Sequence, residues 1–243
     1  TAFVAQDMGM DHIGPFTFTM ARLFLGFLTL LPFMLLKWQP LQKINLKENP
    51  KIFYYLLLVG FMLSFGNSFQ QLALLYTDVA NTAVFTAFYV ILVPMVAYYF
   101  FSKNIHWSIW PSAFFCLLGG FLLTNLESLN VRIGDSIAVL NAFMWAFHIV
   151  FISKLIRIYN YPVIVACLQC LIGSFFALIP ALIFEELIFS NMLLEYKELL
   201  YAGILSSGVA FLLQVYSQQN LSPAPATIIF SLEGVFASIF GWI

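Results

Sequence analysis

Long apolar runs alternate with short polar stretches along this chain, and the pattern predicts membrane-spanning helices. Each run is about 20 residues long, the length of helix that crosses the hydrocarbon core of a bilayer. A transmembrane β-barrel is excluded, because its strands are short and alternate apolar with polar residues. We therefore expect an all-α polytopic membrane protein, with spans near residues 15–37, 53–75, 81–101, 110–126, 134–156, 163–184, 199–219 and 224–243.

The two ends of the sequence interrupt this pattern. The opening stretch 1-TAFVA-5 is apolar but too short to cross a bilayer, and the last apolar run reaches Ile243 without a polar flank. Residue 1 is not methionine, and about 15–20 upstream residues would complete the first span. We therefore expect the sequence to be an internal piece of a longer protein, beginning inside one helix and ending within or just after another.

The composition agrees with this fold class. Apolar residues make up 62% of the chain and charged residues 9%, whereas soluble domains average about 25% charged residues. The net charge of −1 leaves no basic block to neutralise phosphates, so nucleic acid is not an expected partner. The spacing 167-CLQC-170 suits a zinc or redox pair, but the three histidines are scattered along the chain. We interpret the cysteines as packing residues and expect no metal and no cofactor.

Charged residues in the connecting stretches fall into two sets. When successive stretches are assigned to alternate sides, seven Lys/Arg residues fall on one side and two on the other. Lys and Arg concentrate in cytoplasmic loops. We therefore predict a multi-pass protein of the plasma (inner) membrane, with the N-terminus and the lysine-rich loop 38–52 in the cytoplasm and the acidic loop 185–198 outside. The seven cations are Lys37, Lys43, Lys47, Lys51, Lys103, Lys154 and Arg157.

The two halves of the sequence resemble each other. The segment 14-GPFTFTMARLFLGFLTLLP-32 aligns with 161-YPVIVACLQCLIGSFFALIP-180, and 69-FQQLALLYTDVANTAVFTAFYVILVP-94 aligns with 213-LQVYSQQNLSPAPATIIFSLEGVFAS-238. Five helices per half is an odd number, so the second half must enter the membrane from the opposite side, as in inverted-topology repeats. We predict one repeat at residues 1–126 and another at 134–243, in a ten-helix protein of which helix 1 is partial here and helix 10 is absent.

Several motifs resemble those of one known family. The segment 230-FSLEGVFASIFGW-242 is close to the "SLEPVFA" signature of the EamA family, in the drug/metabolite transporter superfamily, with Gly234 where the proline usually stands. The segments 134-GDSIAVLNAFMWAFHIV-150, 222-SPAPATIIFSLE-233 and 76-YTDVANTAVFTAFYVILVP-94 also resemble segments of that family. The resemblance covers nearly the whole chain. It implies ten helices, both termini in the cytoplasm, and export or uptake of small metabolites.

Glu233 and Arg22 are the only charged residues deep within the predicted spans. A charged side chain at a helix centre in the membrane costs roughly 3 kcal/mol, which favours a cavity carboxylate at Glu233 that binds a cation or carries a proton. The alternative is a protonated, hydrogen-bonded glutamate that orders helix packing. The matching residue of the first half is Tyr89, a candidate for substrate stacking or for packing. Thr86 shares the face of Tyr89.

Uncharged amides gather in the two matching spans 53–75 and 199–219. Gln70 and Gln214 align with each other, and Gln214 and Gln218 lie one turn apart on one helix face. Amides inside a bundle commonly link helices, so helix bridging and a polar cavity lined from both halves remain alternatives. The full set of candidates is Asn67, Gln70, Gln71, Gln214 and Gln218.

Four further candidates lie in two other spans. Asn141, Trp145 and His148 follow one another at i, i+4 and i+7, which suits a cavity wall that recognises an amino acid or an aromatic compound. The alternative is a helix-to-helix seam with a neutral histidine.

Arg22 lies roughly 10 Å into its span, at 1.5 Å per residue. For this residue we favour snorkelling toward the outer surface or structural pairing, with binding of a substrate carboxylate as the alternative.

These features favour a secondary transporter over an integral membrane enzyme. The sequence contains no GxGxxG, P-loop, HExxH or GxSxG motif. We expect two five-helix halves that rock around a central cavity, with proton coupling through Glu233 as a candidate mechanism. Expected substrates are an amino acid, a nucleobase-like compound or a lipophilic drug, and the lipid bilayer and a second copy of the chain are the other candidate partners. The alternative is a membrane enzyme or receptor whose polar residues serve helix packing.

Overall fold

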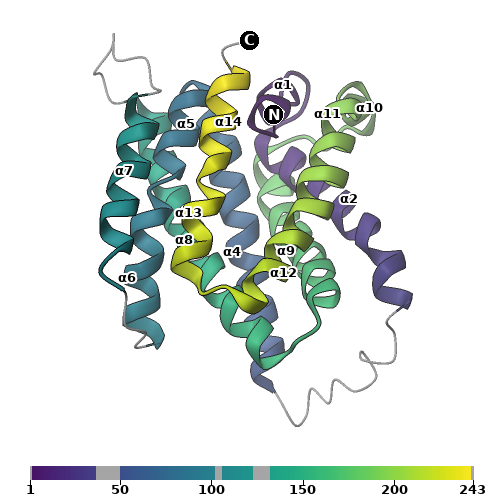
Figure 1. Ribbon diagram of the computed structural model, residues 1–243. Coiled ribbons are helices and arrows are strands. Elements are labelled where there is room, and N and C mark those ends of the chain that lie inside the picture. The colour runs from purple at the N-terminus through teal and green to yellow at the C-terminus, as the bar shows by residue number, and fades with distance from the viewer. Residues whose placement is uncertain (1, 37–49, 102–105, 123–131, 242–243) are drawn as a thin grey trace.

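The computed structural model describes residues 2–36, 50–101, 106–122 and 132–241, and these form a bundle of helices (Figure 1). No β-strand occurs within these ranges, which agrees with the predicted all-α class. The helices are α1 (Ala2–Met8), α2 (Pro15–Leu36), α4 (Pro50–Leu74), α5 (Val79–Thr86), α6 (Tyr89–Phe101), α7 (Ile109–Leu122), α8 (Ile133–Ile158), α9 (Pro162–Phe184), α10 (Phe189–Leu194), α11 (Tyr196–Leu200), the wider i→i+5 helix η1 (Tyr201–Ala210), α12 (Phe211–Asn220), α13 (Pro223–Phe230) and α14 (Leu232–Gly241).

Six helical segments in the described part of the chain are long and apolar enough to cross a membrane. The predicted spans 110–126 and 224–243 appear there as shorter apolar helices, Ile109–Gly119 and Pro223–Ala237. Most of the predicted lysine-rich loop 38–52 lies outside the described residues. The chain is therefore an all-α polytopic membrane protein.

The centre of the bundle is built by α2, α4, α8 and α9, which make the most extensive helix-to-helix contacts. Their facing sides bury a large apolar cluster that includes Leu30, Val59, Ile152 and Ile164. The segments α6–α7 and α12–α14 flank this centre (Figure 1). Because the outward sides of the helices are also apolar, with many exposed Phe and Leu residues, the bundle presents a surface suited to lipid rather than water.

Small residues bring two pairs of helices close together. A Cβ atom added to Gly26 of α2 would lie 2.8 Å from the Cβ of Ser207 in η1, and one added to Gly173 of α9 would lie 3.3 Å from the carbonyl oxygen of Gly60 in α4. Helices that lack side chains at the crossing point can pack backbone to backbone, which is a common way to join helices in membranes. The pairs α2–η1 and α9–α4 therefore each depend on a glycine.

Two of the predicted spans are interrupted. The span predicted at 81–101 is found at Val79–Phe101, and within it a turn at Ala87–Phe88 separates α5 from α6. Within the span predicted at 224–243, a turn at Ser231 separates α13 from α14. The Ser231 hydroxyl donates to the backbone carbonyl oxygen of Ile228 at 2.6 Å. Such a local side-chain bond competes with the regular helix ladder. Among the described residues, no side-chain hydrogen bond of this kind is found at Ala87–Phe88.

One end of the bundle is tied together by polar contacts between the two halves of the chain. At the C-terminal end of α9, the Glu185 carboxylate accepts hydrogen bonds from the backbone N–H of Phe16 (2.8 Å), the backbone N–H of Thr17 (2.7 Å) and the Thr17 hydroxyl (2.6 Å). This carboxylate therefore caps the first turn of α2 from the opposite half. Close by, His12 Nδ1 lies 2.5 Å from a Glu195 carboxylate oxygen.

A second tie at this end joins the loop after α4 to the start of α8. The Asp135 carboxylate accepts hydrogen bonds from the Thr77 hydroxyl (2.6 Å) and from the backbone N–H of Arg132 (2.9 Å). The Arg132 guanidinium donates to Asp78 at 2.8 Å. These contacts fix the start of the second half against the loop between α4 and α5 of the first half.

Candidate functional site

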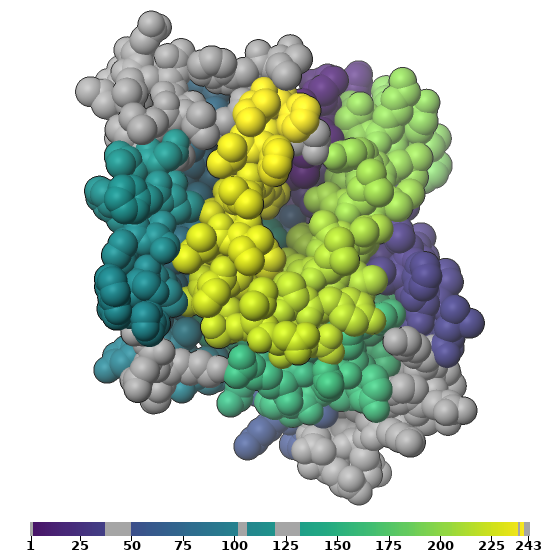
Figure 2. All heavy atoms as spheres, viewed as in Figure 1, coloured from purple at the N-terminus to yellow at the C-terminus, as the bar shows by residue number. Residues whose placement is uncertain are grey.

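A cavity of about 690 Å³ lies inside the bundle, which is within the usual size range of small-molecule sites. Its walls come from both halves of the chain. The space-filling view shows the front of the cavity as a hollow between α14 and η1 (Figure 2). Its polar lining consists of Gln6, Arg22, Asn67, Gln70, Thr86, Tyr89, Trp145, Tyr201, Ser206, Gln214, Ser217 and Glu233.

The two interrupted helices deliver Glu233 and Tyr89 to this cavity. Glu233 lies in the first turn of α14, directly after the turn at Ser231, and its side chain is exposed to the hollow. Tyr89 is the first residue of α6, directly after the other turn, and is buried in the wall. An acidic side chain in the first turn also complements the positive end of the helix dipole. Glu233 can therefore both stabilise α14 and present a carboxylate to a ligand.

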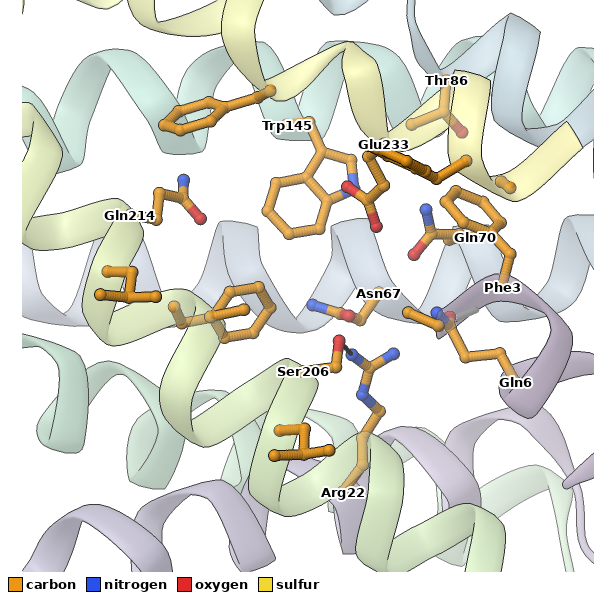
Figure 3. Close-up of a pocket in the computed structure, with 18 of the residues that line it drawn as sticks. Phe3, Gln6, Arg22, Asn67, Gln70, Thr86, Trp145, Ser206, Gln214 and Glu233 are labelled. Atoms are coloured by element: carbon orange, nitrogen blue, oxygen red, sulfur yellow. Dashed lines mark hydrogen bonds between the residues drawn. The ribbon is translucent and has the colours of Figure 1, made fainter. Parts of the chain in front are cut away.

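Arg22 reaches the cavity from α2. Its side chain is only 2% exposed, so it does not extend to the bundle surface. Its Nε donates to the Ser207 hydroxyl and its Nη2 to the Ser206 hydroxyl, both at 3.0 Å, while Nη1 has no partner among the described residues. The guanidinium and the Glu233 carboxylate interact electrostatically, yet they form no ion pair within 4.0 Å. Figure 3 shows the two groups entering the cavity from different walls.

The predicted amides divide between the cavity and the helix seams. Asn67, Gln70 and Gln214 line the cavity. Asn67 donates to the Leu63 carbonyl oxygen at 2.8 Å and leaves its own carbonyl oxygen unpaired. Gln71 and Gln218, two further candidates for the cavity, do not line it. Gln71 instead donates to the backbone carbonyl oxygen of Gln6 at 2.6 Å, and Gln218 is fully buried in α12.

Of the three residues predicted to form a cavity wall along α8, one lines the cavity and two do not. Trp145 lines the cavity, with its indole N–H unpaired among the described residues. Asn141 and His148 do not, contrary to the prediction of a continuous cavity wall. Asn141 donates to the Thr86 hydroxyl at 2.9 Å, and His148 Nε2 lies 3.1 Å from the Gln169 amide oxygen. Because neighbouring helices pack on several sides of α8, residues on one stripe face different partners.

Sequence reasoning missed four polar residues of the cavity wall: Gln6, Tyr201, Ser206 and Ser217. Ser206 belongs to the small-residue run 206-SSG-208 in η1, and its hydroxyl holds one nitrogen of the Arg22 guanidinium. Irregular i→i+5 turns occur frequently at functional sites, and the run of small residues was the available signal. In the described part of the chain, no group of three His, Cys, Asp or Glu residues is arranged to hold a metal ion.

Long apolar helices around an internal polar cavity define the class of this chain, a polytopic membrane protein. The chain matches the model of the EamA-like transporter family over residues 1–125 and 132–243, and it belongs to that family. It is therefore a membrane transporter.

Two similar proteins are known, one by its sequence and one by its fold. A protein of Archaeoglobus fulgidus described as an uncharacterized transporter is 27% identical over 240 residues, which cover 99% of this chain and 72% of that protein. A protein crystal structure aligns with 98% of this chain and 84% of its own chain, with a TM-score of 0.73 and 14% identity. At that identity the likeness shows the fold alone.

Proposed function

We propose that this protein is a secondary transporter that moves a small polar metabolite across the plasma membrane by alternating access. The observation that carries the proposal is the cavity of about 690 Å³, which takes polar groups from both halves of the chain. Two helices that line it are interrupted, at matching positions of the two predicted repeats. Interrupted helices in corresponding halves are typical of transporter binding sites.

Alternating access requires two halves that move relative to each other, and we propose the segments 1–126 and 134–243 as inverted repeats. The close contacts of the bundle support this pairing: Gly26 packs against η1 and its counterpart Gly173 packs against α4, the matching helix. Superposing residues 14–101 on 161–243 should require a rotation near 180° about an axis in the membrane plane. A rotation about the membrane normal would contradict inverted repeats.

We further propose that the end tied together by Glu185 and Asp135 faces outward and that the lysine-bearing end faces the cytoplasm. The charge asymmetry of the connecting stretches supports this orientation. In this arrangement the hydrogen bonds of Glu185 and Asp135 to the first half hold the outer end closed. These bonds would have to break each time the cavity is exposed to the outside.

Glu233 is the proposed proton carrier. It is the only acidic residue that lines the cavity in the described part of the chain, and a carboxylate there can hold a cationic group or a proton, but not both. Glu233→Gln keeps the volume and hydrogen bonding of the side chain and removes its titratable proton. We expect this variant of the full-length protein to fold normally and to lose transport or its dependence on a proton gradient.

The test uses cells that overproduce the full-length protein, and it compares the metabolites they export with those of cells producing Glu233→Gln. Glu186→Gln is the matched control, because Glu186 is an exposed acid outside the cavity. Compounds that appear outside wild-type and Glu186→Gln cells, but not outside Glu233→Gln cells, would identify substrates. Unchanged export and pH dependence in Glu233→Gln would assign this carboxylate to helix packing.

A further inference from the structure

Four buried oxygen atoms in neighbouring helices have no hydrogen-bond partner among the described residues. They are Gln6 Oε1 in α1, Gln71 Oε1 in α4, Thr82 Oγ1 in α5 and Asn141 Oδ1 in α8. Of these residues, Gln6 lines the cavity, and the other three are fully buried in the helices around it. A buried polar atom without a partner is costly. The four oxygens therefore favour a ligand that is separate from the contents of the cavity.

Hydrogen bonds join the helices that carry these atoms in two pairs. The Gln71 amide donates to the backbone carbonyl oxygen of Gln6 at 2.6 Å, which joins α4 to α1. The Asn141 amide donates to the Thr86 hydroxyl at 2.9 Å, which joins α8 to α5. Thr82 lies one turn before Thr86 on the same face of α5. The two pairs are also in contact, because α5 packs against both α1 and α4.

The two amides of α4 and α8 lie at a similar level of the bundle. These helices run in opposite directions, and two glycine contacts show how their residues align. A Cβ added to Gly66 would lie 3.6 Å from the Trp145 indole, and one added to Gly134 would lie 2.7 Å from the backbone carbonyl carbon of Tyr76, just after α4. On each helix the amide lies near the midpoint between these contacts. The bonds described above bring α1 and α5 to the same level.

The unpaired atoms of the two amides are acceptors. A backbone carbonyl can only accept a hydrogen bond, so the bond to Gln6 must use the Gln71 nitrogen and leaves the Gln71 oxygen unpaired. The Asn141 nitrogen is likewise used, in its bond to Thr86. A ligand that suits several oxygen acceptors is either a hydrogen-bond donor or a metal cation.

We infer that Gln6, Gln71, Thr82 and Asn141 form a binding site for a monovalent metal cation, sodium or potassium. Hard cations bind oxygen ligands, and rings of neutral oxygens hold monovalent ions in channel filters. Calcium and magnesium are usually bound with the help of carboxylates, and none of the four residues carries one. This inference goes beyond the proposed transport and does not depend on it, because the site can bind a cation whether or not a substrate moves.

The electrostatic surroundings also favour a cation. Helix α5 ends at Thr86, directly before the turn at Ala87–Phe88. The C-terminal end of a helix carries partial negative charge, and interrupted helices commonly coordinate sodium at such ends. In addition, α14 packs against α5, and a Cβ added to Gly234 would lie 3.7 Å from the Ala83 carbonyl oxygen. The preceding residue, Glu233, therefore places an acid on the neighbouring helix.

Thermal unfolding of the purified full-length protein in detergent tests this inference. Melting temperatures are compared in sodium chloride, potassium chloride and choline chloride at equal ionic strength, because choline is too large for a site between packed helices. A ligand that binds the folded protein raises its melting temperature by mass action. At about ten times the dissociation constant, the better of the two metal ions should raise it by roughly 2–5 °C over choline.

Threonine variants assign the effect to the proposed site. Thr82→Val replaces the hydroxyl with a methyl group and should abolish the difference between metal ion and choline, whereas Thr82→Ser keeps the hydroxyl and should retain it. Thr227→Val is the matched control, because Thr227 is equally buried but lies in α13, where its hydroxyl donates to the Ala224 carbonyl oxygen at 2.7 Å. This control should keep the full cation effect. If Thr82→Val does not fold, Asn141→Ala takes its place, with the same expected loss.

The possible results separate a cation site from a hydrated one. Equal melting temperatures in all three salts would overturn the inference and would assign the four oxygens to ordered water. A cation effect that persists unchanged in Thr82→Val would place the bound ion elsewhere and would also overturn it. A cation effect that is lost in Thr82→Val but kept in Thr82→Ser and Thr227→Val would support the site. Because none of these measurements involves a substrate, the proposed transport can fail or hold independently.

Discussion

Replacing Glu185 with alanine should open the outer end of the transporter. The carboxylate belongs to the second half of the chain, and it accepts three hydrogen bonds from the first turn of α2 in the first half, at 2.6–2.8 Å. Under the proposed mechanism these bonds exist in the state that is closed to the outside and break when that end opens. Their loss should therefore favour the open state.

The size of the effect follows from the role of Glu185 as a helix cap. Losing a capping side chain costs about 0.5–2 kcal/mol, and losing a negative charge at a helix N-terminus costs a further 0.3–1 kcal/mol or so. The closed state should lose roughly 1–3 kcal/mol. Because about 1.4 kcal/mol corresponds to a factor of ten, the ratio of open to closed molecules should rise about 5- to 150-fold.

Accessibility of the cavity from outside measures this shift. Gln214, which lines the cavity, is replaced with cysteine in a full-length protein whose native cysteines have been replaced with alanine. An impermeant maleimide is added outside intact cells. Its rate of labelling should rise about 5- to 150-fold in Glu185→Ala, in proportion to the open molecules. Glu186→Ala is the control, since this neighbouring acid is exposed. An unchanged labelling rate, together with a lowered melting temperature, would show that Glu185 only stabilises α2 and does not hold a gate.

Two further predictions concern orientation and packing. Cysteines introduced at Gln42, outside the described residues, and at Asn191 should differ in intact cells, with an impermeant reagent labelling only Asn191→Cys; the reverse result would overturn the orientation. Gly26→Ala should destabilise the protein by about 1–3 kcal/mol, because the new Cβ would lie 2.8 Å from that of Ser207. Gly119→Ala, where a Cβ meets no atom within 4 Å, should leave the melting temperature in detergent nearly unchanged or raise it.

The fold class and most helix positions could be predicted because they depend on hydropathy, which is a property of the sequence alone. The interruptions at Ala87–Phe88 and Ser231 could not. Both lie within apolar runs that continue without a polar residue pattern to mark a break. The Ser231 hydroxyl bonds to the carbonyl oxygen of Ile228, but Thr227 makes the same kind of bond within α13 without ending it. The position of the turn therefore depends on how the surrounding helices pack, which the sequence pattern does not reveal.

The polarity of a residue does not by itself predict whether it lines the cavity. Glu233 and Gln214 were expected in the cavity and line it. Asn141 and His148 carry equally polar groups, but they find hydrogen-bond partners on neighbouring helices, Thr86 and Gln169. Whether a buried amide or imidazole faces the cavity or bonds to a neighbouring helix depends on how the other helices pack.

The two predicted repeats differ where they face the cavity and agree where they pack. The offset of 147 residues that relates Gly26 to Gly173 also relates Arg22 to Gln169, and Glu233 is matched by Tyr89. The packing glycines are retained in both halves, whereas each intramembrane charge has a neutral counterpart. Charges that served only helix packing in a duplicated bundle would have no reason to differ between equivalent positions. A single unsymmetrical molecule held between two similar halves would require that difference, because its two ends need different partners.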